Sequence, residues 1–160
     1  MDIRLREWRE GDAPVVLRAF QSPDLLRQAP WPVVTLRDAV GWIASWPGAG
    51  HAFAVTVDGR VVGNVAVTRI DGRGSGWVSY WVVPAARGRG VAVAATRRLA
   101  RWAFDERGLG RLELGHRTDN TASCRVATRA GFRLEGIEHG KLGPQGTRYA
   151  VERHTRYATD

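Results

Sequence analysis

The sequence predicts a mixed α/β fold (α+β) in which helices flank a mostly antiparallel sheet of about seven strands, in the order βααβββαβαββ. Three observations support this prediction. Two β-branched runs, Ala52–Val57 and Val61–Ile70, are joined by Asp58-Gly59, which is a strong hairpin signal. A further strand, Trp77–Val83, follows them directly and completes a meander. Helical and strand patterns then alternate to the C-terminus, which differs from a doubly wound parallel sheet.

One strand and two helices are predicted before the meander. An alternating run from Ile3 to Trp8 predicts the first strand. Asp12 is expected to cap the first helix, and the segment Gln21–Val34 is expected to be a loop. The second helix should start at Thr35, because Asp38 stands three residues later as in a capping box.

The elements after the meander are predicted from helical and strand periodicity. A long helix should run from Val91 to Arg107, because Gly108 stands where a helix C-cap prefers glycine. The remaining elements are a strand at Arg111–His116, a helix at Thr121–Ala130, and closing strands at Phe132–Glu138 and Thr147–Arg156.

Composition predicts an ordinary globular protein. The length of 160 residues suits a single domain over residues 1–160, with 44% hydrophobic and 25% charged residues. No apolar run is long enough to span a membrane, and no apolar signal segment follows Met1, so we expect a cytoplasmic protein. The single Cys124 cannot form an internal disulfide, and the four histidines lack zinc-like spacing, so no metal site is predicted.

The chain is strongly basic, with a formal net charge of +8 and a pI near 11.1. Clustered cations would indicate a nucleic-acid partner, but the arginines are scattered over nearly every segment. We therefore expect no nucleic-acid partner and no membrane partner. A general positive field would still attract a smaller polyanionic ligand.

The stretch Tyr80–Ala92 runs from a strand through a small-residue loop into a helix. A helix N-terminus presents unpaired N–H groups and a partial positive charge. Gly88 and Gly90 let the backbone approach a phosphate, and Arg87 and Arg89 supply charged donors. These features predict an anion site; the alternative is an ordinary left-handed turn into a helix.

Two nucleotide-binding loops are excluded by residue spacing. A P-loop requires Gly-Lys-Ser/Thr, which the chain lacks. A dinucleotide fingerprint requires Gly or Ala three residues after the second glycine, where this chain has Val93.

The loop resembles that of the GNAT superfamily, whose diphosphate motif Arg/Gln-x-x-Gly-x-Gly/Ala is matched by Arg87, Gly90 and Ala92. The resemblance covers about Val55–Tyr157 and is closest to the bacterial N-terminal acetyltransferases of ribosomal proteins. Three further segments carry it: Arg111-Leu112-Glu113-Leu114, Asp119-Asn120-Thr121-Ala122-Ser123, and Ala130-Gly131-Phe132-Arg133-Leu134-Glu135-Gly136.

The resemblance implies acetyl-CoA as co-substrate, with no metal. By it, Val82 and Val83 should pair with the pantetheine arm as a strand would. Asn120 should bond the pantetheine amides, and Ser123 should reach the thiol; capping of the short helix is the alternative role for both. The backbone N–H groups expected to hold the diphosphate belong to Gly88, Arg89, Gly90, Val91 and Ala92.

Acyl transfer to an amine needs a base, an oxyanion donor and an acid for the departing thiolate. Glu113 matches a family carboxylate that acts as a base through water; its alternative role is an ion pair with Arg111 or Arg133. Ser123 is the expected proton donor, and backbone N–H near Val83 the expected oxyanion donor. If Glu113 is not the base, the next candidates are Glu135, Glu138 and His139.

The resemblance also implies where the acceptor binds. Trp31, in the loop between the first two helices, and Trp42, on the second helix, are candidate substrate-binding residues, since these helices form the acceptor-side wall in the family. Tyr149, near the C-terminus, is a further candidate. The sequence therefore predicts an N-acetyltransferase acting on the primary amine of a protein N-terminus or of a small molecule. Alternatives are an acyl-CoA sensor without turnover and a basic RNA-binding module, and both a monomer and a homodimer remain open.

Overall fold

The computed structural model describes residues 1–143 and 146–160, and within them seven strands form one sheet in the order β1-β2-β3-β4-β5-β7-β6. All neighbouring strands are antiparallel except β4 and β5, which are parallel. The strands are β1 (Ile3–Glu7), β2 (Gly50–Val57), β3 (Arg60–Thr68), β4 (Ser75–Val82), β5 (Arg111–Arg117), β6 (Arg133–Leu142) and β7 (Arg148–Tyr157).

The helices confirm the predicted order, with two extra single turns. The helices are α1 (Ala13–Ala19), α2 (Pro23–Leu26), α3 (Leu36–Ala44), α4 (Trp46–Ala49), α5 (Val91–Asp105) and α6 (Thr121–Arg129). The short helix α2 occupies a segment that was expected to be a loop, and α4 lies where the second helix was expected to end. Both have proline in the first turn, where its missing N–H is harmless. None of the helices in the described part of the chain is long and apolar enough to cross a membrane.

Local signals account for the parts of the fold that the sequence predicted closely. Asp58 and Gly59 both have positive φ, at 49° and 83°, as a two-residue hairpin turn between β2 and β3 requires. Thr35 and Asp38 form the predicted capping box at the start of α3. Strand β6 is longer than predicted and continues to Leu142, largely exposed at the edge of the sheet.

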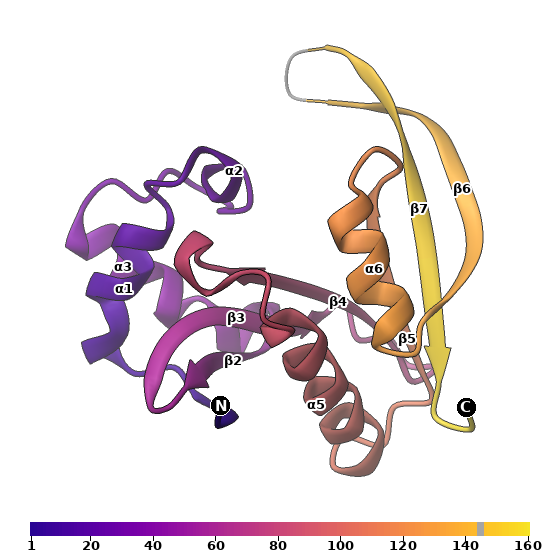
Figure 1. The fold of residues 1–160 in the computed structure, drawn as a ribbon, viewed down its shortest axis with the longest axis horizontal. Helices are drawn as coiled ribbons and strands as arrows, with labels where there is room; N and C mark the ends of the chain where they lie inside the picture. The colour runs from indigo at the N-terminus through magenta and orange to yellow at the C-terminus, as the bar shows by residue number, and fades with distance from the viewer. Residues whose placement is uncertain (144–145) are drawn as a thin grey trace.

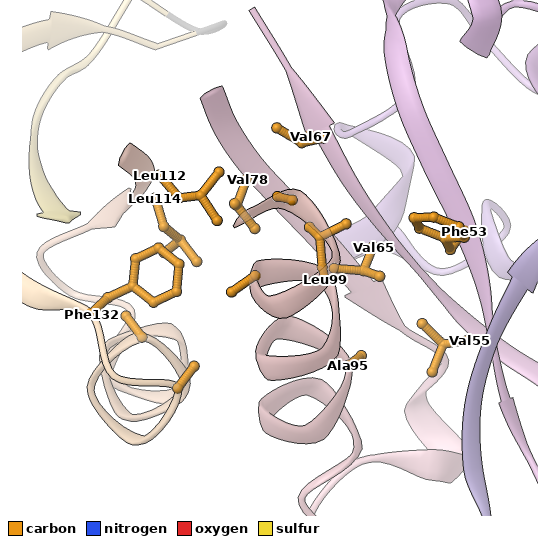
Figure 2. Close-up of a cluster of buried hydrophobic side chains, with 14 of the residues drawn as sticks. Phe53, Val55, Val65, Val67, Val78, Ala95, Leu99, Leu112, Leu114 and Phe132 are labelled. Carbon is orange, nitrogen blue, oxygen red and sulfur yellow. The ribbon is translucent and has the colours of Figure 1, made fainter. Parts of the chain in front are cut away.

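One apolar cluster packs against each face of the sheet. On one face, α5 packs Ala95 and Leu99 against Val65 and Val78 (Figure 2). On the other face, α1 and α3 enclose an aromatic cluster that includes Trp81 of β4. Figure 1 shows α5 and α6 next to each other and the hairpin of β6 and β7 projecting beyond them.

Candidate active site

Strands β4 and β5 separate part-way along their length, and this split is the central feature of the site. Their parallel pairing runs from Ser75 beside Arg111 to Val78 beside Leu114. Beyond Val78, strand β4 continues to Val82 with the β5 side of its backbone not paired to another strand. A strand edge with open N–H and C=O groups can pair with an extended ligand.

Two cavities meet at this split. The first, which we call the α5–α6 groove, has a volume of about 570 Å³ and lies among β4, the start of α5 and α6. The second, which we call the sheet-face cavity, has a volume of about 680 Å³ and is lined by β4, β5, β6 and β7. Both volumes are in the range of small-molecule sites.

The two cavities lie on opposite faces of the sheet. Leu114 of the groove packs in the core beneath α5, whereas Glu113, its neighbour on β5, lines the sheet-face cavity. Trp77, Gly115 and His116 line both cavities. The split is therefore bordered by one compartment on each face of the sheet.

One end of the groove has the geometry of an anion site. Gly88 and Gly90 both have φ near +78°, and among the described residues no atom comes within 4 Å of a Cβ added at either. Gly90 is the N-cap of the 15-residue helix α5, and no side chain of the described residues caps its first turn. The first N–H groups of α5 are therefore open to an anion.

The two loop arginines have different surroundings. The Arg87 guanidinium lies 2.7 Å from a carboxylate oxygen of Asp24 and donates through Nε to the carbonyl of Val82 at 2.8 Å. Arg87 and Asp24 both line the groove, so an incoming anion would compete with Asp24 for this arginine. Arg89 is exposed and donates to the carbonyl of Ala85.

The open edge of β4 belongs to Tyr80 and Val82. The N–H of Val83 donates to the carbonyl of Val62 at 2.8 Å, so it is not free to act as the oxyanion donor. Because alternate residues of a strand direct their backbone groups to opposite sides, the N–H groups of Tyr80 and Val82 face the split. The N–H of Val82, and not that of Val83, is therefore the one available as an oxyanion donor.

A hydroxyl pair lies across the groove from β4 to α6. The phenol of Tyr80 donates to Oγ of Ser123 at 3.0 Å, and both residues line the groove. Burial raises the pKa of the Tyr80 phenol, and the hydrogen bond to Ser123 lowers it by less. Asn120 caps α6 by accepting from the N–H of Ser123 through Oδ1 at 3.0 Å, which leaves its amide N–H₂ available to a ligand.

Sequence reasoning missed Tyr80 as a site residue. Strand alternation places it on the same face of β4 as Val78, toward α5 and α6. A polar aromatic side chain on an otherwise apolar strand face was the available signal.

Glu113 lies in the sheet-face cavity and not in the groove. Its carboxylate contacts the guanidinium of Arg111 at 2.8 Å and that of Arg153 at 3.8 Å. Two other predicted residues, Glu138 and Tyr149, line the same cavity. These three residues are thus brought together on the face opposite the groove.

The two tryptophans expected to contact an acceptor lie elsewhere. Trp42, predicted to bind the substrate, is only 3% exposed, inside the aromatic cluster with Phe20 and Trp81, so its side chain is not accessible to an acceptor. Trp42 lies on the buried side of α3, where a large aromatic residue usually belongs to the core. Trp31 is partly exposed in the segment after α2 and lines neither cavity.

The family model described as an acetyltransferase (GNAT) domain matches residues 2–133, which is most of the chain. The chain belongs to the GNAT acetyltransferase family. The GNAT resemblance expected from Arg87, Gly90 and Ala92 is thereby confirmed, and the matched range includes the groove-lining parts of β4, α5 and α6.

Two curated GNAT relatives from Bacillus subtilis (strain 168) match part of the chain. The probable N-acetyltransferase YjcK is 36% identical over 83 residues, covering 50% of this chain and 45% of its own. The putative ribosomal N-acetyltransferase YdaF is 31% identical over 80 residues, covering 49% and 44% respectively. The match thus spans less than half the length of either relative.

Solved GNAT structures share the fold over nearly the whole chain. An acetyltransferase from Bacillus anthracis has a TM-score of 0.88 at 20% identity, covering 100% of this chain and 97% of its own. Mycobacterium smegmatis RimJ, in complex with CoA-disulfide, has a TM-score of 0.86 at 24% identity, covering 98% and 82%. The seven-stranded mixed sheet found in the described residues is therefore the GNAT sheet.

Proposed function

We propose that the protein is an N-acetyltransferase that transfers an acetyl group from acetyl-CoA to a primary amine. The observation that supports this most directly is the α5–α6 groove, which joins an uncapped helix N-terminus to an open strand edge and to a hydroxyl pair. A ligand with a diphosphate at one end and an extended amide arm at the other has the complementary chemistry.

Each part of the groove has a role in this proposal. The N–H groups from Gly88 to Ala92 hold the diphosphate, and the unpaired backbone edge of β4 at Tyr80 pairs with the amide arm. The amide of Asn120 binds the same arm. The N–H of Val82 is the candidate oxyanion donor, since the N–H of Val83 is already bonded to Val62.

The reaction then needs two proton movements. The amine nitrogen bonds to the thioester carbonyl carbon, the C–S bond breaks, and the sulfur takes a proton. Ser123 is our candidate donor of that proton, and Tyr80, which donates to Ser123, can replace it. Glu113 remains our candidate base, acting through water from the sheet-face cavity on the proton that the amine loses.

The sheet-face cavity is the proposed acceptor site. It joins the groove at Trp77, Gly115 and His116, so an amine entering there can reach a thioester that lies in the split. Tyr149 stands in the wall of this cavity with Arg117 stacked over its ring at 4.9 Å. We propose an uncharged or acidic acceptor, either a protein N-terminus or a small amine, in a cytoplasmic setting.

The first test is binding by thermal unfolding. Coenzyme A at about a hundred times its Kd should raise the Tm by about 5–10 °C, as roughly 2.7 kcal/mol of linkage predicts for this size. ATP and NADH at equal concentration are the controls. A shift with either of them and none with coenzyme A would contradict the proposal.

The second test separates an enzyme from a sensor that only binds acyl-CoA. Acetyl-CoA is mixed with a panel of peptides and polyamines, and free thiol is measured together with the acetylated amine. An enzyme releases one thiol for each amide formed. Binding of coenzyme A without turnover on any amine would favour the sensor.

A further inference from the structure

Four side chains with metal-binding atoms, from β5, α6 and β7, meet beneath α6. His116 lies on β5, Glu152 and His154 on β7, and Cys124 on α6. The pairing of β5 with β7 places His116 directly beside Glu152, and His154 two residues further along the same face of β7. One ligand atom from each of the four residues lies within 4.8 Å of the other three.

Three of these atoms form a compact triangle. The Nε2 atoms of His116 and His154 are 2.9 Å apart, and Oε2 of Glu152 lies 3.4 Å from the first and 3.5 Å from the second. Ligand atoms about 2.0–2.1 Å from a tetrahedral zinc ion are separated by roughly 3.3 Å. The three atoms therefore have nearly the spacing of one face of a zinc tetrahedron.

The ring of His116 is held in the form that a metal ligand needs. Its Nδ1 lies 2.7 Å from the carbonyl oxygen of Arg117, and because a carbonyl only accepts, Nδ1 carries the hydrogen. The lone pair of Nε2 then points toward His154 and Glu152. A hydrogen bond from one ring nitrogen to a backbone carbonyl is the usual support for a zinc-binding histidine.

The ring of His154 is oriented toward the same point. It is 2% exposed, and within the described residues its Nδ1 has no hydrogen-bond partner. Its polar contacts, to His116 and to Glu152, are both made by Nε2. The orientation of this buried ring is therefore set by the groups that contact its Nε2.

We propose that His116, Glu152, His154 and Cys124 form a zinc-binding site. Two imidazoles, a carboxylate and a thiolate are all zinc ligands, and four protein ligands close the coordination sphere as in a structural site. The ion's double charge is balanced by one carboxylate and one thiolate, so the site is neutral. Binding replaces the Cys124 S–H proton with the metal and releases that proton to solvent, and the hydrogen that His154 carries on Nε2 toward His116 and Glu152 moves to its Nδ1.

The site would connect α6 to the sheet at the edge of the α5–α6 groove. Cys124 directly follows Ser123 on α6, and His116 lines the groove on β5. A metal that binds both would fix the helix that carries Asn120 and Ser123 relative to β5 and β7. Zinc therefore acts here as a positioning element and not as a reactant.

The test is titration of the metal-free protein, prepared with a chelator, by calorimetry with Zn²⁺ and by absorbance with Co²⁺. We expect one equivalent of Zn²⁺ to bind and the Tm to rise by about 5–10 °C at a hundredfold excess over Kd. Co²⁺ should give intense tetrahedral absorption together with a thiolate charge-transfer band. These readouts do not depend on acetyl transfer.

The decisive variants are Cys124→Ser and His154→Gln. Each should lower the association constant by at least about tenfold, and Cys124→Ser should also remove the thiolate band. His51→Gln is the matched control, because His51 contacts Glu7 at 2.9 Å as a pair in which the described residues supply no third ligand. It should leave affinity and stoichiometry unchanged.

Three results would overturn the site. The first is the absence of saturable zinc binding to the unmodified chain. The second is an unchanged zinc affinity in Cys124→Ser and His154→Gln, and the third is a loss of zinc affinity in His51→Gln instead. Since His154 is buried, His154→Gln could fail to fold. Cys124 is only half-buried, so Cys124→Ser retains the test in a folded chain.

Discussion

Tyr80 on β4 donates a hydrogen bond of 3.0 Å to Oγ of Ser123 on α6, and this contact joins the two walls of the α5–α6 groove. The two residues are 43 positions apart in the sequence. Burial raises the pKa of Tyr80 more than the hydrogen bond lowers it, so the phenol is protonated at neutral pH and able to donate. The pair is therefore a short proton path that ends at the candidate acid.

Removal of either hydroxyl of this path should slow turnover. We expect Tyr80→Phe and Ser123→Ala each to lower kcat by about 10²-fold, which is the lower end of the effect of losing a general acid. The double variant should be little slower than either single variant, because both hydroxyls belong to one proton path. Tyr157→Phe, at the end of β7, is the control for loss of a phenol and should keep kcat. Full additivity of the two losses would show that the hydroxyls act separately.

Gly90→Ala tests the anion site. A methyl group at φ +78° costs roughly 1–2 kcal/mol of stability, and it also lies where the backbone must approach a phosphate. We expect lower Tm and at least about tenfold weaker binding of coenzyme A, measured by calorimetry. Gly108→Ala has the same strain at φ +68° just beyond α5, so it should lower Tm without weakening binding. Equal binding losses in both variants would place the diphosphate elsewhere.

Glu113→Gln tests the candidate base. If the carboxylate accepts the amine proton through water, the variant should be slowest near neutral pH and recover as pH rises and the amine loses its proton unaided. The same change also removes an ion pair with Arg111. Glu135→Gln is the control, since Glu135 lies 4.0 Å from Arg111 but lines neither cavity. Unchanged kcat in Glu113→Gln from pH 6 to 9 would direct the search to Glu138, which lines the same cavity, whereas Glu135 and His139 line neither cavity.

The ion pair of Arg6 with Asp12 should make stability depend on pH. Hydrogen bonds from the Arg6 guanidinium, at 2.8 and 2.9 Å, lower the pKa of Asp12 below its ordinary value. A lowered folded-state pKa stabilises the fold above the unfolded pKa of about 3.9, and that contribution is lost as pH falls through the folded value. Asp12→Asn should therefore cost about 1–3 kcal/mol at pH 7 and almost nothing in strong acid.

Urea unfolding at several pH values measures this difference. Asp105→Asn is the control, because Asp105 is exposed at the end of α5. It should change stability little at any pH. If Asp12→Asn lowered the free energy of unfolding by the same amount from pH 2 to 8, the contribution of Asp12 would come from packing and not from its charge.

The sequence predicted most reliably those features that depend on a few consecutive residues. The hairpin turn at Asp58 and Gly59 needs only positive φ at two positions, and the capping box needs only Thr35 and Asp38. The start of α5 at Val91 was likewise set by the glycine before it. These elements are local, so neighbouring residues suffice to define them.

Features that depend on strand pairing could not be predicted in this way. Strand β7 is inserted between β5 and β6, and this order alone brings His154 and Glu152 beside His116. The burial of Trp42 depends on α1 and on Trp81 of β4, both distant in the sequence. The placement of Glu113 opposite the groove follows from strand alternation, which the residue type does not reveal.

The last prediction concerns the charge of the acceptor. The chain has a net charge of +8, which repels a polycationic substrate at long range. The acids of the sheet-face cavity do not reverse this, because Glu113 contacts two arginines, Glu138 lies 3.7 Å from Lys141, and Asp71 accepts hydrogen bonds from the backbone N–H groups of Arg73 and Ser75. Peptides with a free N-terminus and acidic or neutral flanks should therefore show higher kcat/KM than Lys/Arg-rich ones, and salt should reduce the difference. An advantage for basic peptides that fades in salt would mean that the cavity's carboxylates outweigh the net charge.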